Sequence, residues 1–288
     1  MRFSFAESMI EPSQLFTLAV EAEQAGFTSF TVPDSICYPE HSDTQYPYYG
    51  DGGREFLEDK PFIEPFVLIP ALAAVTERLR FTTFVVKLPI RHPVLVAKQA
   101  ASVAVLSNDR FGFGIGLSPW PEDFAATGVA WMGRGKRMDE MMEILRGLWS
   151  GDFYEFHGEH FDVPSLKICP VPTRPIPLLV GGHADPALRR AARLGDGWMH
   201  AGGDAAELDA HLARLAELRR EYGREREPFE IHVISLDAYS PDGIRRLEDK
   251  GITDCIVGFR NAYEKDTVPL QQKVDAIRAY GENVVAKV

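Results

Sequence analysis

The chain has little of what a secreted or metal-bound protein normally contains. Only three of its 288 residues are cysteine, Cys37, Cys169 and Cys255, and their spacing is not that of metal ligands. Isolated cysteines of this kind are typical of reduced thiols in the cytoplasm. The N-terminal residues lead directly into a strand-like sequence without a signal-peptide core, and no apolar run approaches the length of a membrane span. We therefore expect a soluble, cytoplasmic protein.

Positive charge is also scarce. Lys and Arg together number 31, against 42 Asp and Glu, so the formal net charge is −11. Surfaces that bind nucleic acids or acidic membranes normally carry an excess of basic residues. This balance argues against a nucleic-acid or membrane partner and leaves a small molecule as the expected substrate. The hydrophobic fraction of 45% is enough for a large core.

What the sequence does contain is a regular alternation of short β-rich runs with helical stretches. Repeated β-then-α units predict a parallel sheet, and eight such units in under 300 residues fit a closed α/β barrel, the (β/α)8 or TIM barrel, better than an open sheet. Without a linker or a shift in composition, we expect one domain over residues 1–288. The expected strands are 2–6, 27–32, 79–86, 110–115, 178–180, 195–200, 229–235 and 252–257.

Two insertions interrupt this pattern, after the second and the fourth expected strand. Residues 35–60 form an irregular segment rich in Tyr, Pro, Asp and Gly, and a loop of that length is usually functional. Because it begins at the mouth of the barrel, we predict a lid with aromatic walls from Tyr46, Tyr48 and Tyr49. A plain surface loop or a dimer contact is the alternative. The second insertion, 117–126, contains a short helix.

A glycine pair at the end of the fifth expected strand is a candidate phosphate site. Gly181 and Gly182 are followed by His183, with Asp185 as the expected N-cap and Pro186 as the first residue of a helix. Backbone N–H groups and a helix N-terminus at this end of a barrel can hold a phosphate. A tight turn without a ligand has the same pattern.

Side chains suited to catalysis are few near the expected strand ends. Lys87 stands at one strand end without an identifiable partner, and no pair of carboxylates with a shared role is evident. His157 and His160 are three residues apart, but in an expected hairpin, so we predict no metal site. A methionine-rich stripe between 138 and 149 predicts a helix packed on the sheet. A mouth of glycine and apolar residues fits an enzyme whose cofactor carries the chemistry.

Six stretches of the sequence stand out, in the order 88–99, 106–116, 134–140, 148–151, 180–182 and 194–198. Together they resemble the luciferase-like monooxygenase family. The resemblance covers most of the chain, and its most similar branch uses the deazaflavin coenzyme F420. It implies an oxidoreductase that passes hydride between F420 and a small organic substrate. Because barrels of this family often dimerise, it also implies a homodimer. The alternatives are an FMN-dependent monooxygenase, which needs a reductase partner, and a barrel that binds a flavin or phosphate ester without turnover.

The resemblance also assigns cofactor contacts to individual residues. It implies that the flavin-like ring lies against Thr83, Phe84 and Val85, where many relatives have a non-prolyl cis peptide. The phosphate would match Gly181 and Gly182, with His183 nearby. Asp34, at the end of the second expected strand, is also assigned to the cofactor site.

One departure from the family concerns catalysis. Relatives often carry Asp-His after the second strand, whereas this chain has Asp34-Ser35. A serine is not a strong acid or base near neutral pH, so Ser35 is a catalytic candidate only by position. Either His41 or Tyr38 takes the role, or the chemistry needs no acid there. Glu122 is the other candidate, as an active-site carboxylate or simply as a charge at a helix N-terminus.

Overall fold

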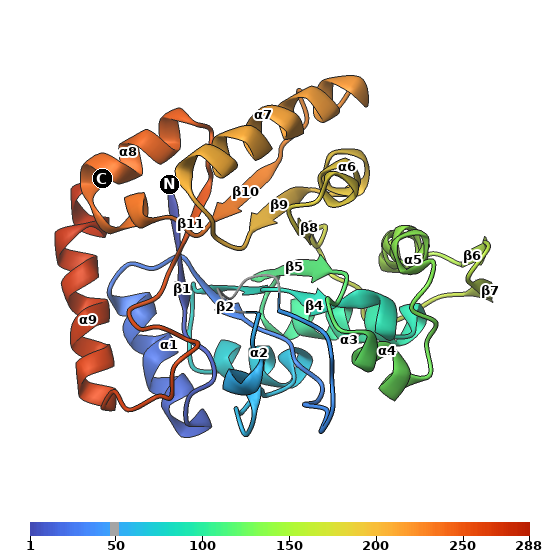
Figure 1. The fold of residues 1–288 in the computed structure, drawn as a ribbon. Coiled ribbons are helices and arrows are strands. Elements are labelled where there is room, and N and C mark those ends of the chain that lie inside the picture. Colours follow the sequence, from blue (N-terminus) through green and yellow to red (C-terminus); the bar gives the residue numbers. More distant parts are fainter. Residues whose placement is uncertain (47–51) are drawn as a thin grey trace.

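The computed structural model describes residues 1–46 and 52–288, and in it parallel strands close into a barrel inside a layer of helices (Figure 1). The strand order is β3-β2-β1-β11-β10-β9-β8-β5-β4, and an additional β3–β5 pairing closes the ring. β3 and β4 together occupy one strand position, or stave, of the barrel. The barrel therefore has eight staves, and the expected (β/α)8 fold is confirmed. The barrel strands are β1 Arg2–Ala6, β2 Ser29–Val32, β3 Arg80–Thr83, β4 Val86–Lys87, β5 Phe111–Gly116, β8 Leu178–Gly181, β9 Gly197–His200, β10 Glu230–Val233 and β11 Asp254–Val257.

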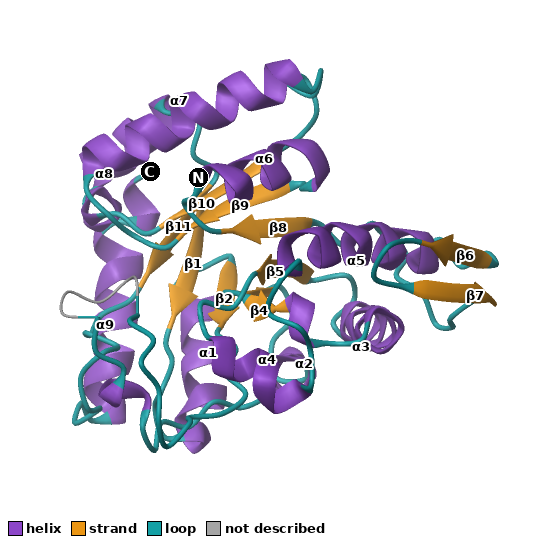
Figure 2. Ribbon diagram, turned by 45° about the vertical axis from the view of Figure 1, so that its right-hand side comes forward, coloured by secondary structure: helices purple, strands orange, loops and turns teal. Residues whose placement is uncertain are grey.

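Helices surround the sheet on its outer face, and a two-stranded antiparallel hairpin projects beyond α5 (Figure 2). No helix in the described ranges is long and apolar enough to cross a membrane. The hairpin is β6 Tyr154–His157 with β7 Asp162–Leu166. The helices are α1 Leu15–Gln24, α2 Pro65–Ala73, α3 Pro93–Leu106, α4 Pro121–Thr127, α5 Arg134–Trp149, α6 Asp185–Leu194, α7 Ala205–Glu221, α8 Pro241–Asp249 and α9 Leu270–Asn283; short 3-10 turns are η1 Pro12–Gln14, η2 Glu55–Leu57, η3 Leu88–Ile90, η4 Leu236–Tyr239 and η5 Val285–Lys287.

Local signals explain where several helices begin. Pro93 occupies the first turn of α3, as predicted. The side chain of Asp204 caps α7 by accepting from the N–H of Glu207, whose own side chain returns the bond. The predicted cap of α6 was wrong, because the N-cap is Ala184 and Asp185 is already helical. The Asp185 carboxylate instead accepts from Arg189 and Arg214 on the surface.

Two kinds of interior hold the barrel together. Between helices and sheet lies a large apolar core, in which the methionine-rich face of α5 is fully buried, as predicted. Inside the barrel, the base is polar. Arg80 donates two hydrogen bonds to Glu230, at 2.8 and 3.0 Å, and Arg2 bridges Glu230 and Asp254. These ion pairs join strands from across the ring at the end away from the mouth.

Candidate active site at the barrel mouth

The third stave of the barrel is interrupted where the sequence predicted one continuous strand. The peptide bond between Phe84 and Val85 is cis, at the place that the family resemblance implied. The Val85 side chain then lies against two glycines: a Cβ on Gly116 or Gly181 would lie 2.7 or 3.0 Å from it. Gly114 gives room to the backbone before the turn, since a Cβ there would lie 1.8 Å from the carbonyl oxygen of Thr83. The glycines of β5 and β8 therefore make space for this turn.

The residues assigned to the cofactor around this turn have different surroundings. Thr83 is fully buried, and its hydroxyl donates to the carbonyl oxygen of Gly114 at 2.6 Å, so its side chain supports the backbone. Phe84 and Val85 are half-buried and pack on a small apolar cluster at the top of the barrel interior. That cluster consists of Leu179, Met199 and Ile256, with Ala6 beside it. Together they form an apolar floor at the mouth.

Asp34 is placed to join two staves. β4 continues the third stave and is hydrogen-bonded to β5 in the sheet. On the other side of β4 lies Asp34, which follows β2. Its carboxylate accepts from the backbone N–H of Lys87 at 2.9 Å. Its second oxygen accepts from Arg91, also at 2.9 Å, and only 1% of the side chain is exposed. The carboxylate therefore takes the place of a backbone pairing between β2 and β4.

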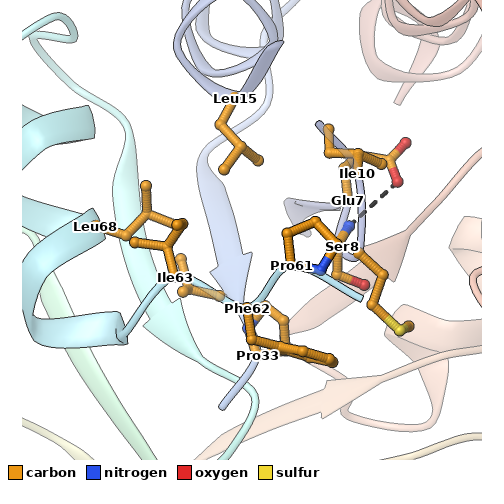
Figure 3. Close-up of a pocket in the computed structure, with 11 residues that line it drawn as sticks. Glu7, Ser8, Ile10, Leu15, Pro33, Pro61, Phe62, Ile63 and Leu68 are labelled. Carbon is orange, nitrogen blue, oxygen red and sulfur yellow. Dashed lines mark hydrogen bonds between the residues drawn. The ribbon is translucent and has the colours of Figure 1, made fainter. Parts of the chain in front are cut away.

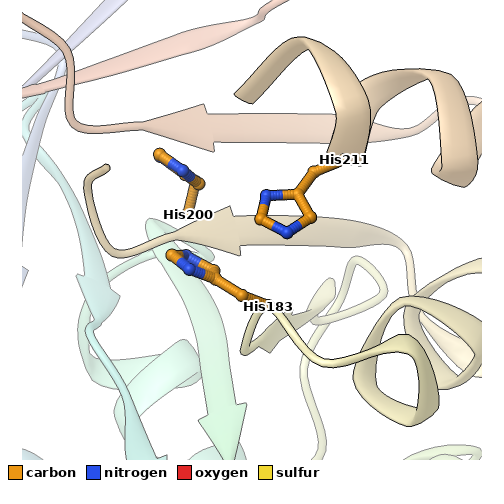
Figure 4. Close-up of side chains that lie close together, drawn as sticks. All are labelled: His183, His200 and His211. Atoms are coloured by element: carbon orange, nitrogen blue, oxygen red, sulfur yellow. The ribbon is translucent and has the colours of Figure 1, made fainter. Parts of the chain in front are cut away.

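The predicted phosphate turn lies beside a cluster of three histidines (Figure 4). Gly182 has a φ of +120°, a conformation that favours glycine. A second glycine pair, Gly202 and Gly203, follows β9 with φ values of +97° and +138°. The indole of Trp198 donates to the Gly182 carbonyl oxygen at 2.9 Å. Glycine backbone without side chains thus flanks the histidines on two sides.

The histidines come from three elements, His183 after β8, His200 at the end of β9 and His211 on α7 (Figure 4). The ring centroids of His183 and His200 are 4.6 Å apart, and His211 lies 5.0 Å from His183. Nε2 of His183 accepts from the N–H of Ala201. Nε2 of His200 and Nδ1 of His211 are buried without a hydrogen-bond partner. The sequence analysis found only His183, because nothing local signals that the other two meet it.

Burial and the neighbouring imidazoles favour the neutral forms of His183 and His200. Burial, together with the neighbouring imidazoles His183 and His211, lowers the pKa of His200 to about 4. Burial and His211 also lower the pKa of His183, against a smaller opposing effect of Glu207. One potential metal-binding atom from each of the three histidines lies within 4.8 Å of the other two. The same holds for Glu230, His232 and Asp254 at the base.

On the opposite side of the mouth, the loop after β2 lies against the start of α4. The rings of Tyr46 and Trp120 stack with centroids 5.4 Å apart, and the Arg54 guanidinium lies 4.4 Å from the Trp120 ring. Phe56 and Tyr263 extend this aromatic group. The described part of the loop therefore covers the fourth-strand insertion, as a lid would. Tyr48 and Tyr49, the other predicted wall residues, lie outside the described residues.

Glu122 belongs to this same group. One carboxylate oxygen accepts from the hydroxyl of Thr44 at 3.3 Å and lies 3.5 Å from Arg54, while the other is buried without a partner. Burial alone would raise the pKa of Glu122, but hydrogen bonds, chiefly from Ser42, and the charge of Arg54 outweigh it and lower the pKa. Glu122 is therefore ionised at neutral pH.

The groups considered as replacements for the missing histidine do not converge. Ser35 is half-buried at the end of β2. The side chain of His41 is 90% exposed, so it points into solvent rather than into the mouth. The ring of Tyr38 lies beneath Arg54, 5.4 Å from its guanidinium carbon. None of these three arrangements places an acid or base over the apolar floor.

Lys87 does have a partner, which the sequence did not identify. Its ammonium lies 2.8 Å from Oδ2 of Asp123, with both side chains almost fully buried. The Ser118 hydroxyl donates to the same carboxylate oxygen, and the Cys37 thiol lies 3.8 Å from the other. This network fixes α4 to the end of β4, directly after the cis bond.

A small pocket opens at the edge of the mouth, between the ends of β1 and β2 and residues 61–63 (Figure 3). Most of its lining is apolar, and Glu7 supplies the charge. Arg260 pairs with Glu7 at 2.8 Å. Burial nevertheless raises the pKa of Glu7, and Arg260 opposes this only in part. Because the carboxylate is held by Arg260, the pocket offers mainly apolar contacts.

Comparison with known proteins defines the family. A model of the luciferase-like monooxygenases matches residues 4–253. The chain belongs to the luciferase-like monooxygenase family. An uncharacterized protein of Mycobacterium tuberculosis is 60% identical over the full length of both chains. An F420-dependent glucose-6-phosphate dehydrogenase of Beutenbergia cavernae is 30% identical, covering 82% of this chain and 67% of its own.

A solved structure shows the same fold. The F420-dependent tetrahydromethanopterin reductase of Methanopyrus kandleri superposes with a TM-score of 0.76, over 99% of this chain and 98% of its own. Its sequence is 14% identical, so the likeness concerns the fold. The family thus includes F420-dependent oxidoreductases alongside monooxygenases.

Proposed function

We propose that this luciferase-like protein is an oxidoreductase that passes hydride between coenzyme F420 and a small organic substrate. The observation that carries the proposal is the apolar floor at the barrel mouth, formed by Leu179, Met199 and Ile256 beside Phe84 and Val85, next to a glycine turn. The F420-dependent relative from B. cavernae supports the choice of cofactor.

The residues at the mouth fit such a cofactor in two places. Phe84, Val85 and Met199 would hold a planar ring by apolar contact. Gly181 and Gly182 would receive the phosphate through backbone N–H groups at the start of α6. When bound, F420 supplies a carrier that gives or accepts two electrons as hydride.

The chain's own side chains then bind and shield the substrate. Trp120 and Tyr46 would exclude water from above the floor, since their stacked rings close one side of the mouth. Glu122 and Arg54 would orient a polar substrate by charge and hydrogen bonds. Ser35 has no role in proton transfer in this proposal, because its hydroxyl does not titrate near neutral pH.

Cofactor titration tests the proposal. Purified protein should quench the fluorescence of added F420, and Gly182→Val should weaken this binding by about tenfold or more, which is about 1.4 kcal/mol. Gly223→Val is a matched control, since Gly223 also has a positive φ (+68°) but meets nothing within 4 Å. Loss of affinity in both variants, or in neither, would contradict a phosphate site at Gly182.

FMN is the second candidate cofactor. One observation favours it: unpartnered buried imidazole nitrogens suit an anion of high charge, and FMN ends in a phosphomonoester. A yellow protein that retains FMN and does not quench F420 would replace the first proposal with an FMN-dependent monooxygenase. Such an enzyme would need a reductase partner. Tight binding of either cofactor without turnover of any substrate would favour a binding barrel.

We also propose that the protein is a homodimer. Neighbouring helices α1, α2 and α3 expose several large apolar side chains, a pattern common at interfaces between subunits. Light scattering after size exclusion should give about twice the mass of 32.2 kDa. Leu95→Lys should shift the mass toward the monomer, whereas the same change at Leu236, exposed on another face, should not. The exposed side chains are Phe16 on α1, Val67 on α2, Val75 in the turn after α2, and Leu95 and Leu106 on α3.

The free cysteines agree with a reducing compartment. Cys37 and Cys169 are exposed and unbridged. We therefore propose a cytoplasmic location, as the sequence predicts.

A further inference from the structure

Arg54, in the loop after β2, has a buried guanidinium whose hydrogen bonds are incomplete. Only 7% of the residue is exposed. Its Nε and Nη1 atoms are shielded from solvent and have no hydrogen-bond partner in the described part of the chain. Buried polar atoms normally have one, and a buried charged group that lacks one is costly. The guanidinium therefore offers donors to an acceptor that the described residues do not supply.

Aromatic rings pack on the faces of this guanidinium. Its central carbon lies 4.4 Å from the Trp120 ring and 5.4 Å from the Tyr38 ring. Aromatic faces attract a cation, whereas the hydrogen bonds of a guanidinium leave along the edges of its plane. Packing on the rings thus leaves the edges available to a ligand. Because Trp120 is itself buried, a ligand bound there would be shielded from water.

Glu122 balances the charge of Arg54 without completing its hydrogen bonds. Oε1 of Glu122 lies 3.5 Å from Nη1, close enough for an ion pair but without the geometry of a hydrogen bond. The Thr44 hydroxyl donates to Oε1, and Ser42 lies close enough to act on the carboxylate. Oε2 has no bond that meets hydrogen-bond geometry. The pair therefore has no net charge but keeps unsatisfied donors.

Two neighbouring carboxylates have other partners. Asp123 pairs with Lys87 at 2.8 Å. Glu55, the next residue along the chain, accepts from the backbone N–H of Arg54 at 2.9 Å. Neither interaction uses Nε or Nη1 of the guanidinium, so both atoms remain available to a ligand.

We propose that Arg54 and Glu122 select a substrate with a neutral carbonyl group, as in a ketone, an aldehyde or an amide, over a carboxylate or an amine. Arg54 donates from Nε or Nη1 to the carbonyl oxygen. The Glu122 carboxylate repels an anion and the Arg54 guanidinium repels a cation, so a group without net charge fits the pair best. No covalent bond forms or breaks in this step. The inference rests on the proposed function and adds the class of substrate.

Three probes of nearly equal size separate these classes. At pH 7 propionamide is neutral, propionate is an anion and propylammonium is a cation. Each is titrated into the protein with and without F420, and ligand-detected NMR gives its dissociation constant. We expect wild type to bind propionamide about tenfold more tightly than either charged probe, because a like charge beside the ligand weakens binding.

Glu122→Gln should change this preference. The variant keeps the size of the side chain but removes its negative charge, so Arg54 should bind propionate about tenfold more tightly than in wild type, with little change for propionamide. Glu55→Gln is the matched control, because it removes an exposed carboxylate that bonds to the backbone of Arg54. That variant should keep the preference of wild type.

Removal of the donors gives a second measurement. Arg54→Met should weaken the binding of propionamide by about tenfold. If this variant does not fold, Arg54→Lys takes its place, since it keeps the charge but loses the Nε donor and the planar shape.

Tighter binding of propionate than of propionamide by wild type would overturn the inference in favour of an anion site. Equal binding of the three probes, or a preference that Glu122→Gln leaves unchanged, would mean that only water completes the bonds of Arg54, and would also overturn it. The same holds if protein that binds F420 binds none of the probes. Failure to bind F420 and FMN would instead contradict the proposed function, while the probes would still test the pair in cofactor-free protein.

Discussion

The ion pair between Lys87 and Asp123 gives the sharpest test of how the mouth is held in place. Its Nζ–Oδ2 distance is 2.8 Å, and only 9% and 3% of the two side chains are exposed. Asp123→Asn keeps the shape and the hydrogen-bonding oxygen but removes the negative charge. The ammonium of Lys87 then stays buried beside a neutral amide. It no longer has the attraction to a carboxylate that offset the cost of its desolvation.

The expected loss in unfolding free energy is about 3 kcal/mol. Breaking a buried pair by removing one partner costs about 3–5 kcal/mol, and the retained amide oxygen places this variant at the lower end. Lys87→Met should also destabilise the protein, by leaving Asp123 unpaired. In the double variant neither charge is left alone, so its loss should be smaller than the sum of the two, with a coupling energy of about 2 kcal/mol.

Urea unfolding at pH 7, followed by circular dichroism, measures these losses as shifts in midpoint at constant slope. Glu159→Gln is the matched control. It removes the partner of Lys136 at 3.3 Å, but the side chains of that pair are 73% and 66% exposed, so we expect about 0–1 kcal/mol. A loss in Asp123→Asn no larger than in the control, or strict additivity in the double variant, would refute the reasoning.

Three further predictions concern the rest of the barrel. Ser35→Ala should leave most turnover intact in a steady-state assay with any substrate the protein reduces or oxidises; a loss of several orders of magnitude with unchanged cofactor binding would show a role for the hydroxyl. Burial alone would raise the pKa of Glu230, but hydrogen bonds from His232 and Arg80 hold it well below its ordinary value, so its stabilising effect is present at neutral pH and is lost as pH falls below about 4.5. Urea unfolding should therefore show a smaller loss between pH 7 and pH 4 in Glu230→Gln than in wild type, and parallel losses would contradict this. Trp120→Ala should speed proteolytic cutting in residues 35–46, since Tyr46 loses its stacking partner; an unchanged rate would mean that the stack does not hold the loop.

Much of the fold could be predicted because its signals are local. β1 and α3 have the predicted bounds, and alternation of strands and helices was enough to predict the barrel. The apolar sequence of 63–77 predicts a helix over that whole range, but α2 spans only Pro65–Ala73. Its last predicted residues form turns and a bend instead. Apolar composition alone did not indicate where the helix ends.

The candidate site was less predictable because it depends on contacts between distant residues. Lys87 and Asp123 are 36 residues apart, and His211 meets His183 from a helix that no motif marks. The sequence also did not predict the interruption between β3 and β4, because Arg80–Thr83 and Val86–Lys87 belong to one β-rich run. The family resemblance located the cis bond, but the sequence did not reveal that Asp34 spans the resulting gap.

That gap gives the described barrel a junction that depends on one side chain. Elsewhere neighbouring strands pair through their backbones, which substitutions other than proline leave in place, but at the mouth β2 and β4 are joined through the side chain of Asp34. A substitution at residue 34 alone would therefore remove this link between β2 and β4 at the mouth. The Arg80–Glu230 pair would keep the base closed. Selection for bulkier substrates, in nature or in the laboratory, has an accessible starting point at residue 34.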